Sequence, residues 1–230
     1  RGKTNNGDEE EIRAPLVLGC DGPTSIVARK LGVYEMEMEH TSVALRCYYE
    51  GVEGLTDQIE LHYVKELNPG YFWLFPAGEG RANIGLGLSK NDAKKEKRTL
   101  RQILDELTKT EYFKDRFANA RKLEKPVGWN LPLGSIHRKN HGNGFMLLGD
   151  AAGLVDPFTG EGIGNAMVSG KYAIQVTEKC RETGDYSESA LTQYDQLLWG
   201  EIGSELRTST KLQSLARYRF LLNFVINRGE

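Results

Sequence analysis

The segment from Gly144 to Met167, GFMLLGDAAGLVDPFTGEGIGNAM, restricts the fold of this chain more than any other stretch of the sequence. Its short apolar run Phe145–Leu148 predicts a buried strand, which delivers Gly149 and Asp150 at its C-terminal end. The later GEGIG, at residues 160–164, opens a helix without large side chains. Open α/β sheets bind ligands at the C-terminal ends of their strands. The segment therefore predicts a strand, a glycine-rich turn and a helix that together hold a ligand.

The residue types in this segment suit a particular ligand chemistry. Asp150 can accept a hydrogen bond from a sugar or polyol hydroxyl, and Gly149 lets the backbone approach a bulky group closely. Asp156 precedes Pro157, which forces an extended bend. The N–H groups and the positive dipole end of the helix that opens at Gly162 can stabilise an anion. A generic glycine-rich strand–helix turn is the alternative interpretation. Ligand binding is favoured because the residues along the whole segment suit it.

A second strand–turn–helix pattern lies near the start of the sequence. The apolar run Ala14–Cys20 predicts a strand buried on both faces. A tight turn follows, and then a helix to about Leu31 with Thr24 or Ser25 as its N-cap.

The turn of this second pattern carries residues that can bind a ligand. Asp21, at the strand end and before Gly22, can orient a ribose hydroxyl or a main-chain N–H group. Arg29 is a natural partner for a phosphate or a carboxylate. A simple capped strand–helix turn is the alternative interpretation.

Residues 41–89 are rich in β-branched and aromatic residues, and turn residues divide them into four runs. The intervals suit an antiparallel meander, and such a sheet commonly keeps one covered face and one open face. Tyr71, Trp73 and Phe75 share one face of their strand because side chains alternate along it. That face is either ordinary core or the boundary of a long apolar cavity.

The rest of the chain adds helices and a further extended stretch. Residues 91–120 have a charged, helical pattern with KKEKR on a solvated face, and residues 123–136 have an extended one. From Gly162 onward the pattern predicts helices, over about 162–181 and 187–199, and one or two more over 200–227. The predicted fold class is therefore α+β or α/β, with an antiparallel sheet and C-terminal helices.

Composition argues against several classes of function. A net charge of −2 gives the chain no long-range attraction for nucleic acid. The three cysteines form no CxxC pair, so a reducing cytoplasm fits best. His137 and His141 lie in a Gly/Asn/Lys-rich stretch without an acidic neighbour, which predicts a solvated turn rather than a metal site. The sequence has no apolar run of about 18 residues that would predict a membrane-spanning helix.

Three motifs carry a resemblance to one group of flavoproteins. GDAAGLVDPFTGEGI resembles the flavin-contacting motif of the p-hydroxybenzoate-hydroxylase-type flavoproteins, and especially that of the geranylgeranyl reductase family. The element Asp21–Arg29 resembles a second FAD-holding element of the same proteins, implicated also in passing NAD(P)H. YFWLFP at residues 71–76 resembles the Y-x-W-x-F-P signature of geranylgeranyl reductases, which is associated with the isoprenoid substrate.

The resemblance implies a role for each matching residue. Asp150 would bind the ribityl chain of FAD, and the backbone at Gly162, Ile163 and Gly164 would face the isoalloxazine ring. The other implied FAD contacts are Asp21, Gly22, Arg29, Gly149, Pro157 and Gly160, and the implied substrate contacts are Tyr71, Trp73 and Phe75. No side chain is identified as a catalytic acid.

The resemblance also implies a function and a division of the chain. The expected activity is reduction of carbon–carbon double bonds in a polyprenyl chain by hydride from reduced FAD, with NAD(P)H or another reductant as electron donor. Residues 1–35 and 123–185 would form the FAD-binding part, 36–122 the substrate domain and 186–230 the C-terminal helices. The strand and GxGxxG turn with which these flavoproteins begin have no counterpart before Asp21, so we expect the chain to start within the family pattern.

Two other functions stay open at the level of the sequence. A flavin-dependent monooxygenase or halogenase would use the same scaffold, although the spellings YFWLFP and VDPFTGEGI favour the reductase. A non-catalytic module that binds lipid or a partner is the alternative of another class. Residues 217–228, RYRFLLNFVINR, combine basic and apolar side chains and would suit a membrane surface, but packing on the chain's own core is the simpler interpretation.

Overall fold

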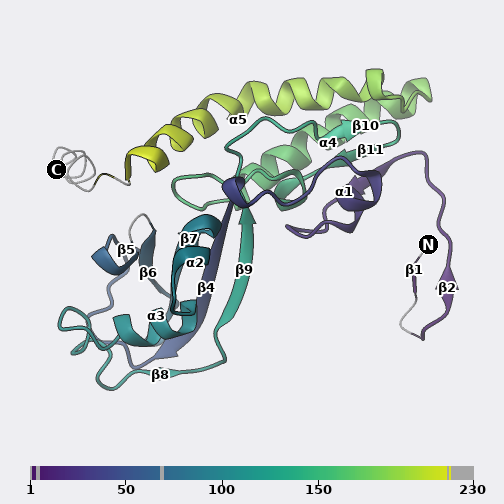
Figure 1. Ribbon diagram of the computed structural model, residues 1–230. Helices are drawn as coiled ribbons and strands as arrows, with labels where there is room; N and C mark the ends of the chain where they lie inside the picture. Colours follow the sequence, from purple (N-terminus) through teal and green to yellow (C-terminus); the bar gives the residue numbers. More distant parts are fainter. Residues whose placement is uncertain (1, 4–5, 68–69, 217, 219–230) are drawn as a thin grey trace. The chain divides into compact units, whose positions relative to one another are not determined.

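The computed structural model describes residues 2–3, 6–67, 70–216 and 218, and its elements form two units (Figure 1). Unit 1 consists of Arg1–Glu35, His137–Leu154 and Gly162–Ser204, and unit 2 of Met36–Ile136, Val155–Glu161 and Glu205–Glu230. Each unit is thus assembled from three separate stretches of the chain. The functional division at residues 35, 122 and 185 stays a prediction.

A small sheet forms the centre of unit 1. Strand β11 (Phe145–Leu147) pairs in parallel with β3 (Val17–Gly19) and antiparallel with β10 (His141–Gly142). The predicted strand at β11 is confirmed, because Met146 and Leu147 are fully buried.

The burial predicted for β3 is wrong. Val17 and Leu18 are 44% and 41% exposed, although the apolar run predicted a strand buried on both faces. Within the described residues β3 is an edge strand with β11 as its one neighbour, so fewer side chains cover it. A second hairpin of unit 1 joins β1 (Gly2–Lys3) to β2 (Glu9–Glu10).

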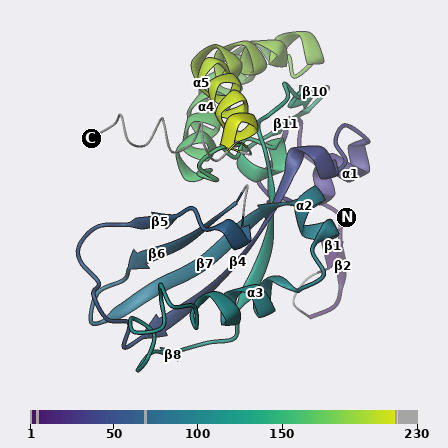
Figure 2. The ribbon, with the colours of Figure 1, turned by 60° about the vertical axis from the view of Figure 1, so that its left-hand side comes forward.

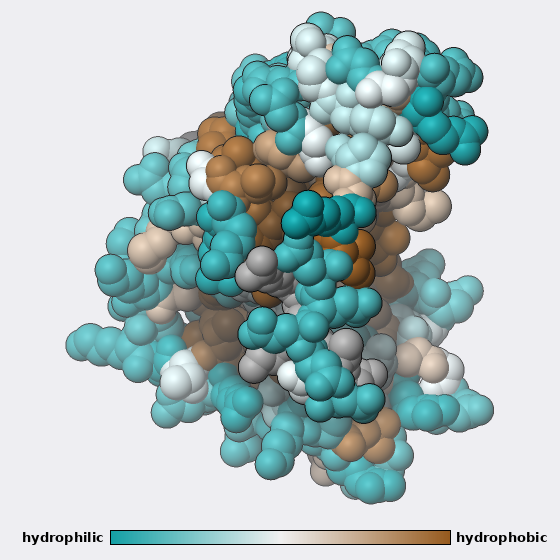
Figure 3. Space-filling model, turned by 90° about the vertical axis from the view of Figure 1, so that its right-hand side faces the viewer, coloured by the Kyte–Doolittle hydropathy of each residue, from teal (hydrophilic) through white to brown (hydrophobic). Residues whose placement is uncertain are grey.

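Helices α1 (Ile26–Leu31), α4 (Ile163–Thr183) and α5 (Glu188–Ala216) begin close to the predicted positions. The predicted break in the last helix at Gly200 is wrong, since α5 runs on to Ala216. A glycine inside a helix costs only about 1 kcal/mol, and the buried Leu198 and Ile202 on either side hold the helix together. Apolar side chains of α4 such as Ile163 and Met167 reach the surface, and Figure 3 shows apolar residues, drawn brown, gathered together on one face.

The sheet of unit 2 is antiparallel throughout, with the order β5-β6-β7-β4-β8 and with β9 also paired to β4 (Figure 2). Its strands are β4 (Thr41–Glu50), β5 (Glu60–His62), β6 (Tyr71–Pro76), β7 (Arg81–Ser89), β8 (Arg121–Lys122) and β9 (Val127–Pro132). The predicted meander is wrong in one respect, because β4 pairs with β7 rather than with β5. Residues 51–59 connect β4 to β5 and are longer than the two to five residues of an ordinary hairpin loop.

One face of this sheet is covered, as predicted. Helices α2 (Lys90–Lys95) and α3 (Leu100–Leu107) pack against it, and α3 begins with a capping box formed by Thr99 and Gln102. The predicted helix over 91–120 ends early, but the turns after Leu107 still bury Phe113. The covered core comprises Leu45, Cys47, Tyr49, Val52, Leu67, Phe72, Leu74, Ala82, Ile84, Leu86, Leu88, Ile103, Leu104, Leu107, Phe113 and Phe117.

A bilayer-spanning helix must be both long and apolar. None of the described helices combines the length and the apolar character that crossing a membrane would demand. The stretch RYRFLLNFVINR lies outside the described residues, apart from Tyr218.

Candidate functional site

The turn after β3 is built around the carboxylate of Asp21. Its Oδ1 accepts a hydrogen bond from Ser25 Oγ at 2.6 Å, and its Oδ2 accepts the backbone N–H groups of Ile26 at 2.6 Å and Val27 at 3.1 Å. Burial alone would raise the pKa of Asp21, but these hydrogen bonds lower it below its ordinary value. Of the two roles considered for Asp21, the structure displays the one toward main-chain N–H groups. Arg29 is exposed on α1, and Ser25 is the N-cap of that helix.

The turn after β11 requires glycine at its first residue. Gly149 has φ +56°, and a Cβ atom at this position would lie 3.1 Å from Ala166 Cβ on α4. Its N–H donates to Ser169 Oγ at 3.1 Å, and Ser169 Oγ in turn donates to the carbonyl of Ala166 at 2.6 Å. The turn is therefore held directly against the first part of α4.

Asp150 follows in this turn, and its carboxyl group is half-buried. Among the described residues it has no hydrogen-bond or ion-pair partner. Burial therefore raises the pKa of Asp150 above its ordinary value. A half-buried carboxylate without a partner is an acceptor for a hydroxyl group that the ligand brings, which fits the role expected for Asp150 toward the ribityl chain of FAD.

The start of α4 is built from Gly162, Ile163 and Gly164. Gly162 is the N-cap residue and offers no side-chain hydrogen bond, and the first turn contains no acidic residue. The side chain of Ile163 is 78% exposed. Asn165 does not cap the helix either, because its Nδ2 donates to the carbonyl of Leu154 at 2.8 Å. The first turn of α4 therefore contributes no carboxylate of its own to the positive end of the helix dipole.

Arg138 contacts Gly153, at the end of the turn that follows β11, and the sequence did not point to this residue. Its side chain is buried, its guanidinium stacks over the ring of Tyr34 at 4.8 Å, and Nη1 donates to the carbonyl of Gly153 at 3.5 Å. A Cβ atom on Gly153 would come within 2.8 Å of this Nη1. The sequence offered no signal, because an arginine in a polar stretch is ordinarily solvated.

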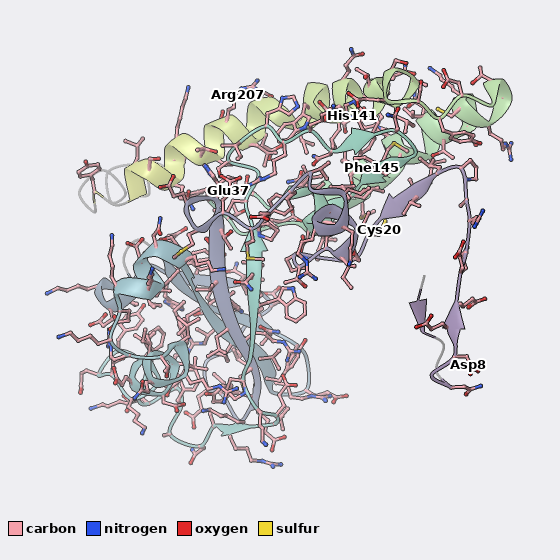
Figure 4. All side chains as sticks on the ribbon, turned by 45° about the vertical axis from the view of Figure 1, so that its right-hand side comes forward. Asp8, Cys20, Glu37, His141, Phe145 and Arg207 are labelled. Carbon is pink, nitrogen blue, oxygen red and sulfur yellow. The ribbon has the colours of Figure 1, made fainter. Side chains whose placement is uncertain are left out.

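The predicted solvated turn around His137 and His141 is wrong at His141, whereas the side chain of His137 is 57% exposed. His141, labelled in Figure 4 on β10 beside Phe145 of β11, is only 5% exposed. His137 Nε2 lies 2.7 Å from Asp195 Oδ2, and His141 Nδ1 lies 3.9 Å from Asp195 Oδ1. Burial alone would raise the pKa of Asp195, but its interactions with the two histidines, including the hydrogen bond with His137, lower it. The acidic partner comes from α5, far away in sequence.

In unit 2, residues 155–161 of the motif form a closed loop around Asp156. Asp156 is 6% exposed, and its Oδ1 accepts hydrogen bonds from Phe158 N at 2.9 Å and from Thr159 N at 2.8 Å and Oγ1 at 3.0 Å. Its own N–H donates to the carbonyl of Glu161 at 2.7 Å, and Gly160 N donates to the carbonyl of Asp156 at 3.0 Å. An aspartate that starts a turn is a local signal that sequence reasoning could have used.

The aromatic strand β6 contacts this loop within unit 2. Tyr71 Oη donates to the carbonyl of Thr159, and a Cβ atom on Gly160 would lie 3.0 Å from the same Oη. Burial raises the pKa of Tyr71 to about 12, so the hydroxyl stays a donor at neutral pH. Ring centroids are 6.0 Å apart between Tyr71 and Trp73 and 5.9 Å apart between Trp73 and Phe75. Two predicted groups, the motif loop and the aromatic row, are therefore neighbours.

The predicted residues fall into one group in each unit. Unit 1 contains Asp21, Gly22, Arg29, Gly149, Asp150, Gly162, Ile163 and Gly164, and unit 2 contains Pro157, Gly160, Tyr71, Trp73 and Phe75. In unit 1 these residues lie in the turns that follow β3 and β11 and at or near the starts of α1 and α4, and in unit 2 they lie on β6 and in the loop of residues 155–161. Neither group contains an identified catalytic acid.

Comparison with known proteins gives consistent results. Residues 41–128 match the model of the geranylgeranyl reductase catalytic domain. The chain is 34% identical over 206 residues to digeranylgeranylglycerophospholipid reductase 2 of Methanococcoides burtonii, covering 88% of this chain and 48% of that protein. It is 34% identical over 200 residues to a digeranylgeranylglycerophospholipid reductase of Methanosarcina acetivorans, covering 86% and 47%. The chain therefore spans about half the length of these curated relatives.

Solved structures show the same relationship. A geranylgeranyl bacteriochlorophyll reductase-like protein from Thermoplasma acidophilum superposes with a TM-score of 0.82 at 29% identity, covering 90% of this chain and 51% of that one. A flavin-dependent brominase superposes with a TM-score of 0.74 at 19% identity, covering 96% and 56%, which indicates a shared fold. With the domain match, the curated relatives and the motifs in agreement, the chain belongs to the geranylgeranyl reductase family.

Proposed function

We propose that this chain supplies flavin-facing and substrate-facing parts of an FAD-dependent oxidoreductase that reduces carbon–carbon double bonds of a polyprenyl chain. The single observation that carries the proposal is the half-buried Asp150 carboxylate without a partner, in a glycine turn that leads to the start of α4. The names of the relatives, digeranylgeranylglycerophospholipid reductases, support the substrate class.

The residues of unit 1 fit the demands of a flavin nucleotide. Asp150 would accept a hydrogen bond from a ribityl hydroxyl, and the backbone at Gly162, Ile163 and Gly164 would face the ring. Asp21, Gly22 and Gly149 would shape the turns, and Arg29 would bind a phosphate. FAD, when bound, supplies the hydride-transfer chemistry. The proposed electron donor is NAD(P)H or another reductant, and a cytoplasmic location stays a prediction.

The residues of unit 2 would position the substrate. Pro157 and Gly160 lie in the loop closed by Asp156, and Tyr71 fixes that loop to the aromatic strand. Trp73 and Phe75 continue the row with stacked rings. An aromatic wall of this kind binds a hydrocarbon chain and excludes water from it, as a hydride transfer requires.

The experiment uses the full-length protein purified with its flavin. A visible absorbance spectrum first establishes whether FAD is bound. Anaerobic addition of NAD(P)H should then bleach the flavin, and geranylgeraniol should restore its absorbance while a product with fewer double bonds forms. The proposal is wrong if the reduced flavin is reoxidised by air with release of peroxide but never by a prenyl alcohol, which would indicate the monooxygenase or halogenase alternative. A protein that binds no flavin would indicate the non-catalytic module.

A further inference from the structure

The pairing of strands in unit 2 places residues from five strands on the open face of the sheet. Directly paired residues in an antiparallel sheet point to the same side. Starting from Trp73 and from Tyr71, the register gives two neighbouring rows across the sheet. The rows are Leu61, Trp73, Gly85, Arg46 and Val127, and Tyr71, Gly87, Ala44 and Trp129.

The middle of these rows carries little side-chain volume. Gly87 and Ala44 sit between Tyr71 on β6 and Trp129 on β9. Gly85 is already covered, because a Cβ atom there would overlap the indole ring of Trp73. Neighbouring strands lie about 4.8 Å apart, so Gly87 and Ala44 together form a shallow floor about two strands wide. Trp73, in the neighbouring row, also borders that floor, because a Cβ atom on Gly87 would lie 3.9 Å from Cζ3 of its indole ring.

Trp129 borders the same floor on the other side. Its side chain is 59% exposed, and that of its neighbour Val127 on the same face is 44% exposed. An indole left this open on a sheet face is unusual, because aromatic side chains contribute most to stability when they are buried. The exposed ring is therefore available to a ligand rather than to the protein's own core, which lies on the opposite face.

Three polar side chains of these two rows have partners within unit 2. Trp73 Nε1 donates to Asn83 Oδ1 at 2.9 Å, and Tyr71 Oη donates to the carbonyl of Thr159. The guanidinium of Arg46 is paired with the carboxylate of Glu124 and lies over the ring of Tyr48. A peptide laid on the floor would lose hydrogen bonds to water without replacement, whereas a hydrocarbon would lose none. The face therefore matches a long apolar chain.

We propose that Trp129 is a specificity-determining residue of the prenyl site. Its side chain forms the wall opposite Trp73 and contacts the part of a long isoprenoid chain that has crossed the floor of Gly87 and Ala44. The inference rests on the proposed function and adds to it the far end of the site and a basis for chain-length selection. The floor is about 10 Å wide, so a chain seated against Trp73 gains the full contact with Trp129 only when it extends well beyond that width.

The test compares W129A with the wild type in the full-length, FAD-loaded protein. The KM for geranylgeraniol should rise about tenfold, because burial of roughly half an indole is lost, while its kcat and the KM for geraniol should change less than about twofold. W129F should recover most of the affinity. Y112A is the matched control, since Tyr112 is 70% exposed but packs with Phe113 on the covered side, and it should leave both KM values unchanged. Equal KM changes for the two alcohols in W129A, or no change at all, would overturn the inference.

Binding measured by titration calorimetry separates this inference from the proposed function. A wild type that binds geranylgeraniol but reduces no prenyl alcohol would overturn the function, and the ratio of Kd values between wild type and W129A would still decide the role of Trp129. That ratio should be about ten for geranylgeraniol and near one for geraniol. A wild type that binds neither alcohol would overturn both.

Discussion

Gly149 combines two constraints that a side chain cannot meet. Its φ is +56°, and the space where a Cβ would lie is bounded by Ala166 Cβ at 3.1 Å. Replacement by alanine should therefore lower the free energy of unfolding by about 1–3 kcal/mol. Urea denaturation of G149A measures this loss. The control is G170A inside helix α4, where nothing lies within 4 Å of the added Cβ, and which should stabilise by up to about 1 kcal/mol. Equal effects of the two substitutions on the free energy of unfolding would contradict the requirement for glycine at position 149.

Asp21 predicts a pH dependence of stability with a definite sign. Its carboxylate accepts three hydrogen bonds, so the pKa of Asp21 is lower in the folded chain than the ordinary value of 3.8. A lowered pKa gives stability that is present above the unfolded value and is lost as the pH falls through the folded value. D21N should therefore be less stable than the wild type by about 1 kcal/mol at pH 7.

Urea denaturation at pH 7 and at pH 3 should show the difference between wild type and D21N shrinking at the lower pH, because the wild-type carboxylate begins to be protonated there. D57N, at an exposed position in a surface loop, should show no such difference at either pH. A gap between wild type and D21N that widens at low pH would contradict the role of the carboxylate.

Single residues also show where sequence reasoning reaches its limit. Asp21 and Asp150 could be selected from the sequence because each directly follows an apolar run, and strand ends collect ligand-binding groups. Arg138 and His141 could not, because their burial depends on Tyr34, Gly153 and Asp195, which are remote in sequence. Asp156 lies between these cases, since its hydrogen bonds are local but only the folded loop shows that it is buried.

At the scale of elements, the local sequence pattern predicted which segments form strands better than it predicted which strands pair with each other. The aromatic strand β6 and the glycine-rich β7 were visible from composition and turn residues. The pairing of β4 with β7 was not, because strand order depends on how residues 51–59 are routed. The exposure of β3 was not predictable for the same reason, since an apolar run does not specify how many strands lie beside it.

The loop of residues 155–161 is an element whose shape depends on one side chain. D156A would remove the acceptor that serves Phe158 N, Thr159 N and Thr159 Oγ1, and the loop should open. Hydrogen exchange at Phe158 and Thr159 should become at least about tenfold faster, because each lost hydrogen bond contributes about 1 kcal/mol or more. The exchange rates of β11 amides in unit 1 serve as the internal control.

Partial rescue distinguishes the loop's hydrogen bonds from a general loss of stability in this variant. D156N retains an acceptor oxygen of similar geometry and should restore much of the protection at Phe158 and Thr159. Unchanged exchange in D156A, or acceleration spread evenly over the whole of unit 2, would show that Asp156 does not hold the loop.

For the whole molecule, the path of the chain links the two units through one motif. Residues Gly149–Leu154 and Gly162–Gly164 belong to unit 1, whereas Val155–Glu161 belong to unit 2. A ligand that binds the native motif and not the unfolded chain stabilises the protein by mass action. Stripping FAD from the full-length protein should therefore lower its Tm, and adding FAD at about 100 times its Kd should restore about 2.7 kcal/mol of stability.

Asp150 supplies the variant that makes this whole-molecule prediction specific. Its pKa is raised by burial, so the charged form costs stability once the pH is above the ordinary value, and D150N should be at least as stable as the wild type without flavin. The loss of a charged acceptor should weaken FAD binding about tenfold or more, so the rise in Tm on adding a fixed concentration of FAD should be smaller in D150N. Differential scanning calorimetry of both proteins, stripped and reloaded, measures the two effects separately. A stripped D150N that melts well below the stripped wild type would show that Asp150 serves the fold, whereas equal rises in Tm would show that it does not hold the flavin.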